Sequence, residues 1–348
     1  MEEKLDVSAQ MNIIAPMFIL DICDQLPNMT AFVHVSTAYC HAERYVVEET
    51  VYPLPRPLDD MVENCLNGGQ LTQAEVKRFI SPKPNTYVFT KTLAETVVKK
   101  HGYRGYPVAI FRPAIVSTSL RDPFTGWVQD YNGPIGTTVA TLKGVMRVVN
   151  CNEDLRADFL PVDICANTLI TVAWEVVIDN PSDLRVYNCS TGDNPTTWRE
   201  LRENILEEIR ENPIPSIMWY PSLYMITNRY VFKVAALFLE TIPLYFIELF
   251  MRIFGKNKKR LNLIKVNKRL VGMRNALEHC STHEYWYTTN NVRRLRARLT
   301  QADAAIYNIE PTSICWKDYF KSYARGIKRH LIGDKEAGTP KAKKHLER

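Results

Sequence analysis

The sequence contains no glycine before Gly68, although 14 glycines occur among its 348 residues. Residues 1–67 therefore lack the glycine-rich turn that lets a backbone approach a phosphate group. The eight cysteines form no Cys-x-x-Cys pair, and the chain does not open on an apolar secretory signal. These absences predict free thiols in a reducing intracellular compartment. His279, Cys280 and His283 have no second cluster to complete a ligand set, so we expect no bound metal.

No excess of one charge sign marks the sequence. The formal net charge is +6, and the chain is 46% hydrophobic and 24% charged, as globular proteins are. This mildly basic balance is not typical of a dedicated nucleic-acid-binding protein, so we expect no nucleic-acid partner. The length suits one large domain or two ordinary ones.

The sequence also lacks a long apolar run without charges. Its most apolar stretch, residues 231–254, contains Pro243, and four charged residues interrupt it: Lys233, Glu240, Glu248 and Arg252. A membrane-spanning helix needs about 20 apolar residues with few charges, so we expect this stretch not to span.

We predict instead two short amphipathic helices, separated at Pro243, that lie on a membrane surface as a hairpin. Four basic residues follow the stretch and favour this arrangement: Lys256, Lys258, Lys259 and Arg260. A buried helix pair in a second domain is the alternative that periodicity leaves open.

Two hydroxyl side chains follow a short apolar segment near the N-terminus. Residues 5–27 carry apolar side chains at helical spacing, and residues 29–35 are a β-branched run that predicts a buried parallel strand. Ser36 and Thr37 come directly after this strand, at the end where ligands bind in open α/β sheets. They are candidate donors to a substrate carbonyl, or they satisfy the last backbone groups of the strand.

Asn12 lies among apolar residues in the middle of the helix predicted over residues 5–27. Asparagine is a poor residue for a helix interior unless its side chain makes a specific hydrogen bond. One interpretation is that it holds a water molecule or a backbone carbonyl that relays protons to a nearby lysine. The other is a buried structural asparagine.

Tyr87 and Lys91 stand four residues apart in the segment 85–95. On a helix this spacing places both on one face, one turn from each other. A lysine ammonium near a phenol favours the phenolate, so we predict that Lys91 lowers the pKa of Tyr87. Such a tyrosine can donate a proton to an oxygen that gains negative charge, as carbonyl reduction by hydride requires. Most such pairs are ordinary surface residues, so the surrounding sequence has to decide.

A second buried strand is predicted after this helix, over residues 106–111. Strand, helix and strand form a βαβ unit with a right-handed crossover. Residues 41–84, between the first strand and the helix, are acidic, proline-dotted and irregular, typical of a flap beside the substrate or of variable surface.

Further elements are predicted downstream. Helices are expected over residues 137–149 and 164–177, the second with Asp163 as its N-cap. A last strand is expected over 187–190, and Thr197, with a glutamate three residues later, opens a helix with a capping box. Strands that alternate with helices predict an α/β fold.

Six stretches are more specific together than any one of them alone. In chain order they are His-Val-Ser-Thr-Ala-Tyr-Cys at 34–40, Tyr-Val-Phe-Thr-Lys-Thr-Leu-Ala-Glu at 87–95, Phe-Arg-Pro-Ala-Ile-Val at 111–116, Gly-Trp-Val-Gln-Asp-Tyr-Asn-Gly-Pro-Ile-Gly at 126–136, Asp-Phe-Leu-Pro-Val-Asp-Ile-Cys-Ala-Asn at 158–167 and Tyr-Asn-Cys-Ser at 187–190. In this order they resemble the fatty acyl-CoA reductases, alcohol-forming enzymes of the extended short-chain dehydrogenase/reductase superfamily.

The resemblance implies an enzyme that reduces a long-chain acyl-CoA to a fatty alcohol with NADPH and releases CoA. It implies that Tyr87 and Lys91 are the catalytic pair and also contact the cofactor. The remaining implied residues are Ser36 or Thr37 as the catalytic hydroxyl, Asn12 as the asparagine of the preceding helix, and Pro113, Ala114, Ile115 and Val116 beside the nicotinamide.

The resemblance also implies the fold class and the domains. The fold is an α/β, truncated Rossmann-like, doubly wound parallel sheet followed by a helical C-terminal domain. Four ranges are expected: a reductase domain at 1–215, a linker and apolar membrane-associating hairpin at 216–260, a helical domain at 261–332, and a disordered tail at 333–348.

Two departures from the family pattern bear on the cofactor. The Gly-x-x-Gly-x-x-Gly turn that opens the family's first strand and helix is absent, so we expect the sheet to lack its first strands. Ala15-Pro16 also stands where the family has Gly-Thr. The sequence is then interpreted either as a piece of a reductase or as a short protein that retains the substrate half.

The rival functions come from other classes. A sugar epimerase uses the same kind of Tyr–Lys pair, but the long helical C-terminal region argues against it. A non-catalytic acyl-CoA- or membrane-binding remnant that has lost the cofactor site is supported by the missing glycines. The expected location is intracellular and membrane-associated, at the endoplasmic reticulum or the peroxisome, and self-association into a homo-oligomer is a further expectation.

Overall fold

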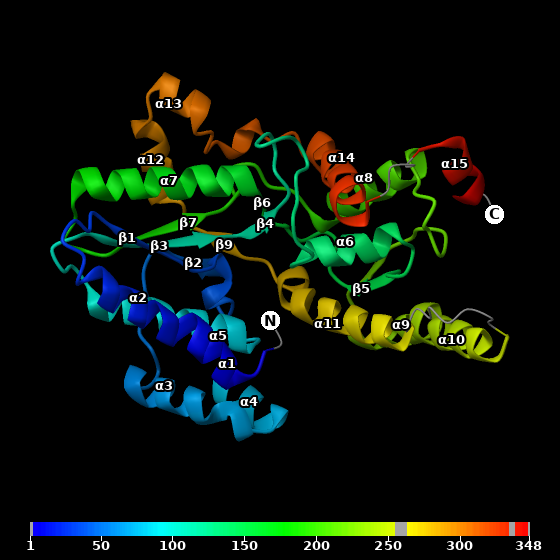
Figure 1. Cartoon of the computed structure of the whole chain (residues 1–348), viewed down its shortest axis with the longest axis horizontal. Helices are drawn as coiled ribbons and strands as arrows, with labels where there is room; N and C mark the ends of the chain where they lie inside the picture. Colours follow the sequence, from blue (N-terminus) through cyan, green and yellow to red (C-terminus); the bar gives the residue numbers. More distant parts are fainter. Residues whose placement is uncertain (1–2, 255–262, 334–337, 347–348) are drawn as a thin grey trace. The chain divides into compact units, whose positions relative to one another are not determined.

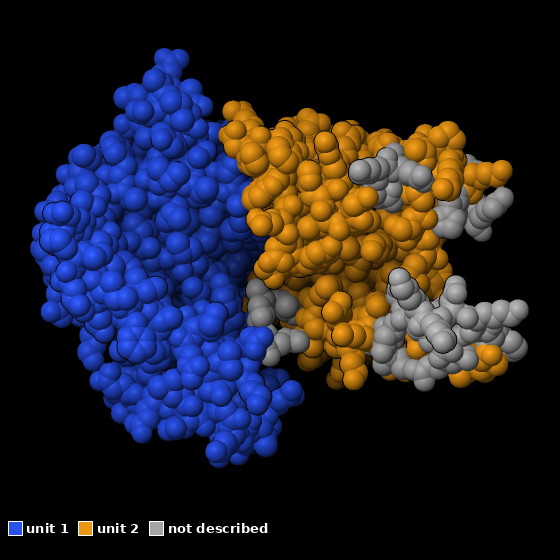
Figure 2. Space-filling model, in the orientation of Figure 1, with its two compact units in different colours: residues 1–116, 158–194, 285–313 blue, residues 117–157, 195–284, 314–348 orange. Residues whose placement is uncertain are grey.

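The computed structural model describes residues 3–254, 263–333 and 338–346 (Figure 1). The chain divides into two compact units, each made of three separate segments (Figure 2). Unit 1 comprises residues 1–116, 158–194 and 285–313, and unit 2 comprises residues 117–157, 195–284 and 314–348. These units interleave along the chain, so their bounds cannot be compared one by one with the linear domain ranges expected from the sequence. Those ranges stay a prediction.

A parallel sheet forms the centre of unit 1. Its strands are β1 (Phe32–Val35), β3 (Val108–Pro113) and β7 (Arg185–Cys189), in the order β1-β3-β7. Val35 is in register with Phe111, and Phe111 with Tyr187, so all three strands run in the same direction. The strands predicted from the apolar runs are therefore confirmed, and their carboxyl ends meet at one edge of the sheet.

Helices cover both faces of this sheet (Figure 1). On one side lie α1 (Leu5–Ala9), α2 (Ala15–Cys23) and α5 (Thr86–His101), and on the other lies α7 (Val162–Asp179) with α12 (Asn290–Arg298). Side chains of the first group form one apolar core with strand residues of β3 and β7. The predicted α/β class with a parallel sheet covered on both faces is confirmed.

Two helices continue past a proline by means of a π-turn. The first runs from α1 through η1 (Gln10–Ile14) into α2, and Pro16 follows the π-turn. The second runs from α9 (Arg229–Ala236) through η4 (Leu237–Thr241) into α10 (Ile242–Phe254), which contains Pro243. A proline ring clashes with the carbonyl four residues earlier, and the wider π-turn moves that carbonyl away. The predicted hairpin with a break at Pro243 is therefore wrong.

Residues 41–84 contain more regular structure than the sequence suggested. The 3-10 helix η2 (Ala38–His41) ends at the first residue of this range. It is followed by β2 (Val46–Val47), α3 (Leu58–Leu66), η3 (Asn67–Gln70) and α4 (Gln73–Ile80). Thr72 and Glu75 form a capping box at the start of α4. That Thr-x-x-Glu pattern was the available signal, so the prediction of an irregular flap is wrong for these helices.

Helices dominate unit 2 around one short strand pair. Besides α9 and α10, its helices include α6 (Pro134–Leu142), α8 (Trp198–Glu211), α11 (Leu263–Thr282) and α14 (Trp316–Ile327), which continues into η6 (Lys328–Ile332). The strands are β5 (Val148–Asn150) and β8 (Tyr224–Ile226), which run parallel. The helix expected over 137–149 ends early, because Gly144 turns the chain at a φ of +71°.

The remaining elements are short. Strand β4 (Ile115–Ser117) pairs with β6 (Phe159–Pro161), and β2 pairs with β9 (Trp286–Tyr287). Helix α13 (Gln301–Ile306) and η5 (Pro311–Ser313) follow α12. The expected all-helical region is thus interrupted by β9. Helix α15 (Pro340–Leu346) occupies part of the tail expected to be disordered, which corrects that prediction for these residues.

Two capping predictions have different outcomes. Thr197 accepts a hydrogen bond from the backbone N–H of Glu200 at 3.2 Å, so it is the N-cap of α8. The predicted capping box is only half formed, because the Glu200 carboxylate accepts the hydroxyl of Thr196. Asp163 does not cap α7, because Pro161 precedes the helix and Asp163 lies buried in its first turn. The basic residues expected beside the apolar stretch, Lys256, Lys258, Lys259 and Arg260, lie outside the described residues.

Candidate active site

Tyr87 lies in the first turn of α5, which is held by its N-cap. The side chain of Asn85 accepts a hydrogen bond from the backbone N–H of Val88 at 2.9 Å, so the helix begins immediately before Tyr87. The side chain of Thr37, which follows β1, lies near enough to the Tyr87 phenol to lower its pKa. The structure therefore brings two of the predicted catalytic side chains close to each other.

Lys91 ties the same face of α5 to the end of β1. Its Nζ donates a hydrogen bond to the carbonyl oxygen of Val35 at 3.0 Å. Burial lowers the pKa of Lys91 below its usual value, while the negative charge of Glu95 one turn further along opposes this change. The ammonium group thus lies at the carboxyl edge of the sheet, one helical turn from Tyr87.

The pKa of Tyr87 departs from the prediction. Burial of the phenol raises its pKa above the usual value, and the nearby Cys40 thiol adds to this, whereas the hydrogen bond from Thr37 lowers it. The predicted decrease caused by Lys91 is therefore wrong for this structure, because removal of the phenolate from water is the dominant effect. The phenol is held protonated, which is the form that can donate a proton.

Ser36 and Thr37 occupy different environments although they are adjacent. The Thr37 hydroxyl lies on the side of Tyr87 and accepts the backbone N–H of Tyr39 at 3.2 Å. The backbone N–H of Ser36 donates to the carbonyl of Phe111 at 2.8 Å, and its buried hydroxyl finds no partner among the described residues. Buried hydroxyls are normally hydrogen-bonded, so the Ser36 hydroxyl is an available donor at this edge.

Asn12 reaches the same helix from the other side. It lies in the π-turn η1, and its Nδ2 donates to the hydroxyl of Thr90 at 2.9 Å. Thr90 immediately precedes Lys91 and in turn donates to the carbonyl of Thr86 at 2.8 Å. Isolated π-turns are frequent at functional sites. The structure thus brings Asn12 to α5, beside Lys91.

The segment from Pro113 to Val116 continues from β3 at the same edge of the sheet. Pro113 is in register with Cys189 of β7, and the N–H of Ala114 donates to the Cys189 carbonyl at 3.0 Å. Ile115 is buried and Val116 is partly exposed. Because β1 and β3 are parallel neighbours, this segment and the hydroxyls of Ser36 and Thr37 follow adjacent strand ends.

A buried ion pair beneath these residues was missed from the sequence. Arg112 Nε and Nη2 donate to the two carboxylate oxygens of Glu95 at 2.8 and 2.6 Å, and neither side chain is exposed. Burial alone raises the pKa of Glu95, but the bonds from Arg112 outweigh it and hold that pKa well below its usual range. Two signals were available: an arginine in an apolar strand needs a partner, and Glu95 lies one turn after Lys91.

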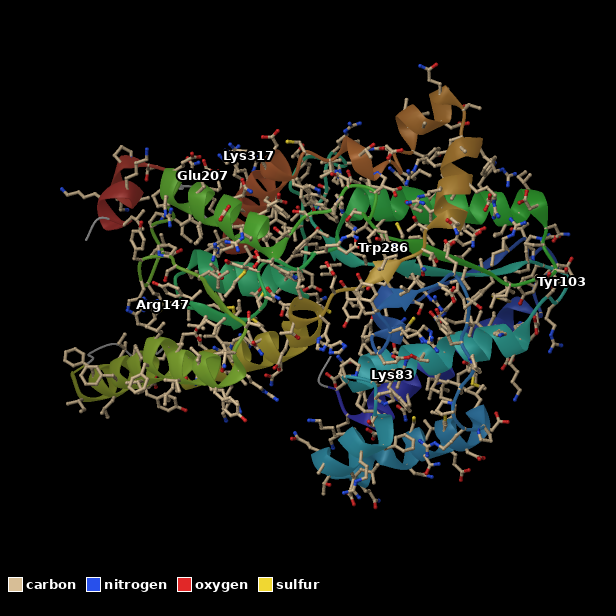
Figure 3. The ribbon with its side chains drawn as sticks, turned by 180° about the vertical axis from the view of Figure 1, so that it is seen from behind. Lys83, Tyr103, Arg147, Glu207, Trp286 and Lys317 are labelled. Carbon is tan, nitrogen blue, oxygen red and sulfur yellow. The ribbon has the colours of Figure 1, made fainter. Side chains whose placement is uncertain are left out.

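Arg112 also fastens the loop after β2 to the sheet. Its Nη1 donates to the carbonyl of Glu48 at 2.9 Å and its Nη2 to that of Thr50 at 2.7 Å. Lys83, labelled in Figure 3, donates to the carbonyl of Cys40 at 2.7 Å from the segment before α5. These bonds fix the chain that runs beside Tyr87 and Lys91.

Cys40, His41 and Glu95 place three potential metal-ligand atoms within 4.8 Å of one another. Their environment favours a structural role. Glu95 already pairs with Arg112 through both oxygens, and burial raises the pKa of the Cys40 thiol well above its usual value, which keeps it protonated. Since metal binding requires the thiolate, the expectation of no metal here stays a prediction.

The site residues fit one part of a nicotinamide dinucleotide. Tyr87, Lys91 and the segment after β3 suit the ribose and nicotinamide end, and the orphaned Ser36 hydroxyl lies beside them. The pyrophosphate end is different. Gly68 and Gly69 lie in η3 against α1, where a Cβ on Gly68 would come within 2.8 Å of Leu5, so they serve helix packing and not a phosphate.

A parallel α/β fold with a Tyr–Lys pair and a hydroxyl at the carboxyl edge of the sheet defines a short-chain dehydrogenase/reductase type of protein. Residues 1–169 match the NAD-binding profile of the male sterility protein family, and residues 239–334 match its Sterile profile, also described as male sterility protein. The chain belongs to the fatty acyl-CoA reductase family.

Curated relatives match the chain along almost its full length. Fatty acyl-CoA reductase 1 of Mus musculus is 31% identical over 351 residues, which cover 99% of this chain and 67% of that protein. The protein of the same name from Homo sapiens is also 31% identical with the same coverage. Fatty acyl-CoA reductase wat of Drosophila melanogaster is 30% identical over 358 residues and 67% of its length.

A solved structure supports the fold. The terminal R domain from the myxalamid PKS-NRPS biosynthetic pathway superposes with a TM-score of 0.52 at 14% identity, over 92% of this chain and 63% of that chain. At this identity the likeness concerns the fold alone.

Two helices of the described residues are long and apolar enough to cross a membrane, Leu5–Cys23 and Arg229–Phe250. The helix Arg229–Phe250 continues through Pro243 and is therefore longer than the two short helices expected there. By length and composition it meets the requirement for a membrane span, which corrects the expectation that this stretch fails it. Length and composition are weak evidence, since core helices of other proteins meet the same test.

Proposed function

We propose that this chain reduces long-chain fatty acyl-CoA to a fatty alcohol with NADPH and releases CoA. The observation that carries the proposal is the bond from Lys91 to the Val35 carbonyl at the carboxyl edge of a parallel sheet, one helical turn from Tyr87 and next to the Ser36 hydroxyl, which has no partner among the described residues. The relatives, named fatty acyl-CoA reductases, support the choice of a thioester substrate and an alcohol product.

The three hydroxyl groups would act on the substrate carbonyl. The thioester oxygen would bind at the Tyr87 phenol and the Ser36 or Thr37 hydroxyl, which would stabilise the negative charge that develops there. A bound nicotinamide dinucleotide would supply a hydride to the carbonyl carbon in each of two rounds. Tyr87 would donate one proton in each round and regain one from solvent in between. The first proton would leave with CoA as its thiol, and the second would complete the alcohol.

Lys91 and Asn12 would position the other groups. The Lys91 ammonium, held at the Val35 carbonyl, would orient the cofactor ribose. Asn12, through Thr90, fixes the turn of α5 that carries Lys91. Pro113, Ala114, Ile115 and Val116 form the wall beside the nicotinamide.

The apolar helices support association with a membrane, and the location we propose is an intracellular membrane, the endoplasmic reticulum or the peroxisome. The helix formed by α9, η4 and α10 leaves large side chains exposed along most of its length: Tyr230, Val231, Val234, Leu237, Phe238, Ile242, Tyr245, Phe246, Leu249, Phe250 and Ile253. Exposed apolar surface of this extent marks a contact with a membrane or another protein. Long acyl chains partition into membranes, so the substrate would be at hand there.

The test compares the native sequence with Tyr87→Phe in an assay of palmitoyl-CoA with NADPH or NADH. The native chain should consume two molecules of NADPH for each hexadecanol and each free CoA thiol that it forms. Tyr87→Phe should lower the rate at least about 100-fold. Thr312→Val, a change at an exposed position on η5, is the control. Comparable turnover by Tyr87→Phe would reject the catalytic role of Tyr87. If the native chain neither binds NADPH nor reduces palmitoyl-CoA, the proposal fails in favour of a non-catalytic acyl-CoA-binding protein.

A further inference from the structure

Three tyrosine rings of unit 1 form a cluster that we call the aromatic wall: Tyr39, Tyr285 and Tyr287. The ring of Tyr39 lies edge-on to the other two, with centroid distances of 5.4 Å to Tyr285 and 6.0 Å to Tyr287. Tyr285 and Tyr287 stack with their centroids 6.2 Å apart. These are favourable separations for aromatic pairs, so the three rings form one packed surface.

The aromatic wall lies at the edge of the sheet that carries the candidate active site. Its rings belong to one apolar cluster with Ala38 and Ala114. Ala38 directly follows Thr37, and Ala114 directly follows Pro113, the last residue of β3. The backbone N–H of Tyr39 donates to the Thr37 hydroxyl at 3.2 Å. The wall therefore borders both the hydroxyls that follow β1 and the segment that follows β3.

Strand β9 brings two of the rings from a distant part of the chain. Tyr287 is in register with Val47 of β2, and the N–H of Trp286 donates to the carbonyl of Tyr45 at 2.8 Å. Successive side chains of a strand point to opposite faces, so Tyr285 and Tyr287 share one face. Trp286, labelled in Figure 3, lies on the other face and is 48% exposed.

A buried amide fastens β2 and β9 to the sheet. Asn188 of β7 donates from Nδ2 to the carbonyls of Val47 and Thr288, at 3.0 Å each. Asn188 is fully buried and immediately precedes Cys189, which is in register with Pro113. The chain's own contacts thus hold the wall in place, so the wall stays at this edge when a cofactor binds or leaves.

The wall combines residues from both family profiles. Tyr285 and Tyr287 lie in the stretch that matches the Sterile profile, residues 239–334, while Tyr39, Tyr87 and Lys91 lie in the NAD-binding stretch, residues 1–169. Within unit 1, the structure therefore adds part of the second profile to the site formed by the first.

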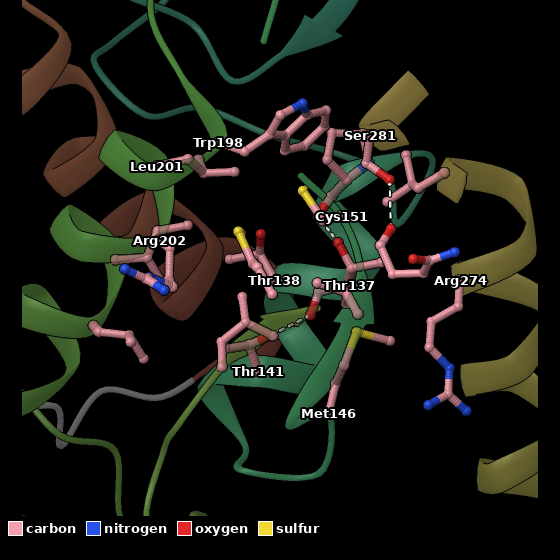
Figure 4. A pocket seen from close by; sticks show the side chains of 18 residues that line it. Thr137, Thr138, Thr141, Met146, Cys151, Trp198, Leu201, Arg202, Arg274 and Ser281 are labelled. Atoms are coloured by element: carbon pink, nitrogen blue, oxygen red, sulfur yellow. Dashed lines mark hydrogen bonds between the residues drawn. The ribbon is translucent and has the colours of Figure 1, made fainter. Parts of the chain in front are cut away.

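The pocket in Figure 4 does not include the aromatic wall. Residues of unit 2 alone line that pocket, among them Thr138 and Met146, which the figure labels. The wall belongs to unit 1 and is complete without any residue of that pocket.

Two rounds of hydride transfer make a specific demand on this edge of the sheet. After the first round, the aldehyde has to stay bound while the oxidised dinucleotide leaves and a reduced one binds. Water adds to an exposed aldehyde and gives a hydrate, which has no carbonyl group to accept the second hydride. Aromatic faces that the chain itself holds in place exclude water and bind apolar carbon atoms throughout this exchange.

We infer that the aromatic wall contacts the carbon chain next to the reacting carbonyl and retains the aldehyde between the two rounds. The nature of the bound carbonyl compound rests on the proposed function, while the place of the wall rests on the contacts of unit 1 alone. The rings position the substrate, and Tyr87 remains the proton donor.

The first test measures how much aldehyde escapes while the full chain reduces palmitoyl-CoA with NADPH. Gas chromatography gives the ratio of hexadecanal to hexadecanol. Tyr39→Ala and Tyr285→Ala should each raise this ratio at least about fivefold, because less apolar surface holds the aldehyde. Native ratios in both variants, with native circular dichroism spectra, would overturn the inference.

Two control variants accompany this test. Tyr285→Phe keeps the ring and should keep the native ratio. Tyr103→Ala removes a partly exposed tyrosine that precedes β3, at the opposite edge of the sheet, and should also leave the ratio unchanged. An equal rise of the ratio in Tyr103→Ala would show that loss of any tyrosine has this effect, and would overturn the inference.

The second test needs no variant and no turnover. Hexadecanamide that carries a photoreactive diazirine next to its amide group has a carbonyl that stands in for that of the substrate. With the native chain, cross-links should fall in the peptides that cover residues 36–42 or 285–288. Their absence from both peptides would overturn the inference.

Failure of this inference can be separated from failure of the proposed function. If the native chain forms hexadecanol but neither peptide is labelled and the alanine variants keep the native ratio, the wall assignment fails and the reductase proposal stands. If the peptides are labelled but palmitoyl-CoA is not reduced, the wall is confirmed as a carbonyl-binding surface and the reductase proposal fails.

Discussion

Arg112 and Glu95 show how a single residue pair supports the candidate site without contacting a substrate. Both side chains are fully buried, and they link β3 to the helix face that carries Tyr87 and Lys91. A buried charge is tolerated only when it is paired and hydrogen-bonded. The pair therefore keeps Lys91 in place beside Val35 by fixing the helix turn that follows it.

The substitution Arg112→Met should lower the free energy of unfolding by about 3–5 kcal/mol, because Glu95 would remain buried without its partner. Urea denaturation followed by circular dichroism measures this change. The control is Arg199→Met, which removes an exposed arginine that pairs with Asp154 and should cost less than about 1 kcal/mol. An equal effect of both substitutions would contradict the role of the buried pair.

His34 should make stability depend on pH. It lies buried on β1, where burial and then the charge of Lys91 lower its pKa from 6.5 to about 4. The unfolded chain takes up the proton near pH 6.5 and the folded chain only near pH 4, so the stability contribution is complete above pH 6.5 and is lost as the pH falls toward 4.

His34→Gln should flatten this part of the pH profile. The measurement is the urea midpoint of the native chain and of the variant at several pH values between 4 and 7. The difference between the two profiles isolates His34 from the other histidines. Parallel profiles over this range would show that His34 keeps an ordinary pKa.

At the scale of the elements, the helix of α9, η4 and α10 has two different faces. Ala236, Glu240, Leu244 and Glu248 are buried, while Phe238, Phe246 and Ile253 are each more than 60% exposed. Leu244 belongs to an apolar cluster with Val145, Met146 and Leu270. One face thus packs on the rest of unit 2, and the other remains open to an apolar partner.

The exposed face should bind lipid. Replacement of Phe238, Phe246 and Ile253 by serine should move the protein from the floating to the soluble fraction when liposomes are floated on a density gradient, because the apolar area that enters the bilayer is lost. Ile170, Val177 and Ile178 of α7 are also exposed, and their replacement by serine is the matched control. Recovery of the native chain in the soluble fraction would reject the membrane proposal.

Elements with a simple local pattern were predictable, and those set by distant contacts were not. The apolar runs give β1, β3 and the helix with Tyr87 and Lys91, because buried parallel strands and capped helices have local signals. The continuity of α9 and α10 past Pro243 depends on a π-turn that no local rule announces. The Arg112–Glu95 pair could be suspected, but its partners at Glu48 and Thr50 follow only from the packed loop.

At the scale of the whole molecule, unit 1 exposes apolar surface at the helix before β1. Met11, Phe18 and Ile22 are each more than half exposed, and β1 pairs on one side with β3 and is unpaired on the other among the described residues. An unpaired strand edge and an exposed apolar helix face promote association with another chain. These features support the expected homo-oligomer as a proposal.

Sedimentation velocity at several protein concentrations should show species larger than the 40.1 kDa chain. The double substitution Phe18→Glu and Ile22→Glu should shift the distribution toward the monomer, because charge on this face opposes contact. Ile178→Glu, on an exposed position of α7, should leave the distribution unchanged. A monomer at every concentration tested for the native chain would reject self-association.

The interleaved segments of the two units affect how the chain is made in the cell. Unit 1 requires residues 285–313, and unit 2 requires residues 314–348, so neither unit is complete before these segments have been synthesised. At about 5–20 residues per second, β3 waits roughly 10–40 s for the last segment of unit 1, and β1 waits longer. During that time their apolar edges are open to incorrect pairing, so we expect chaperones that hold nascent chains to raise the yield of folded protein.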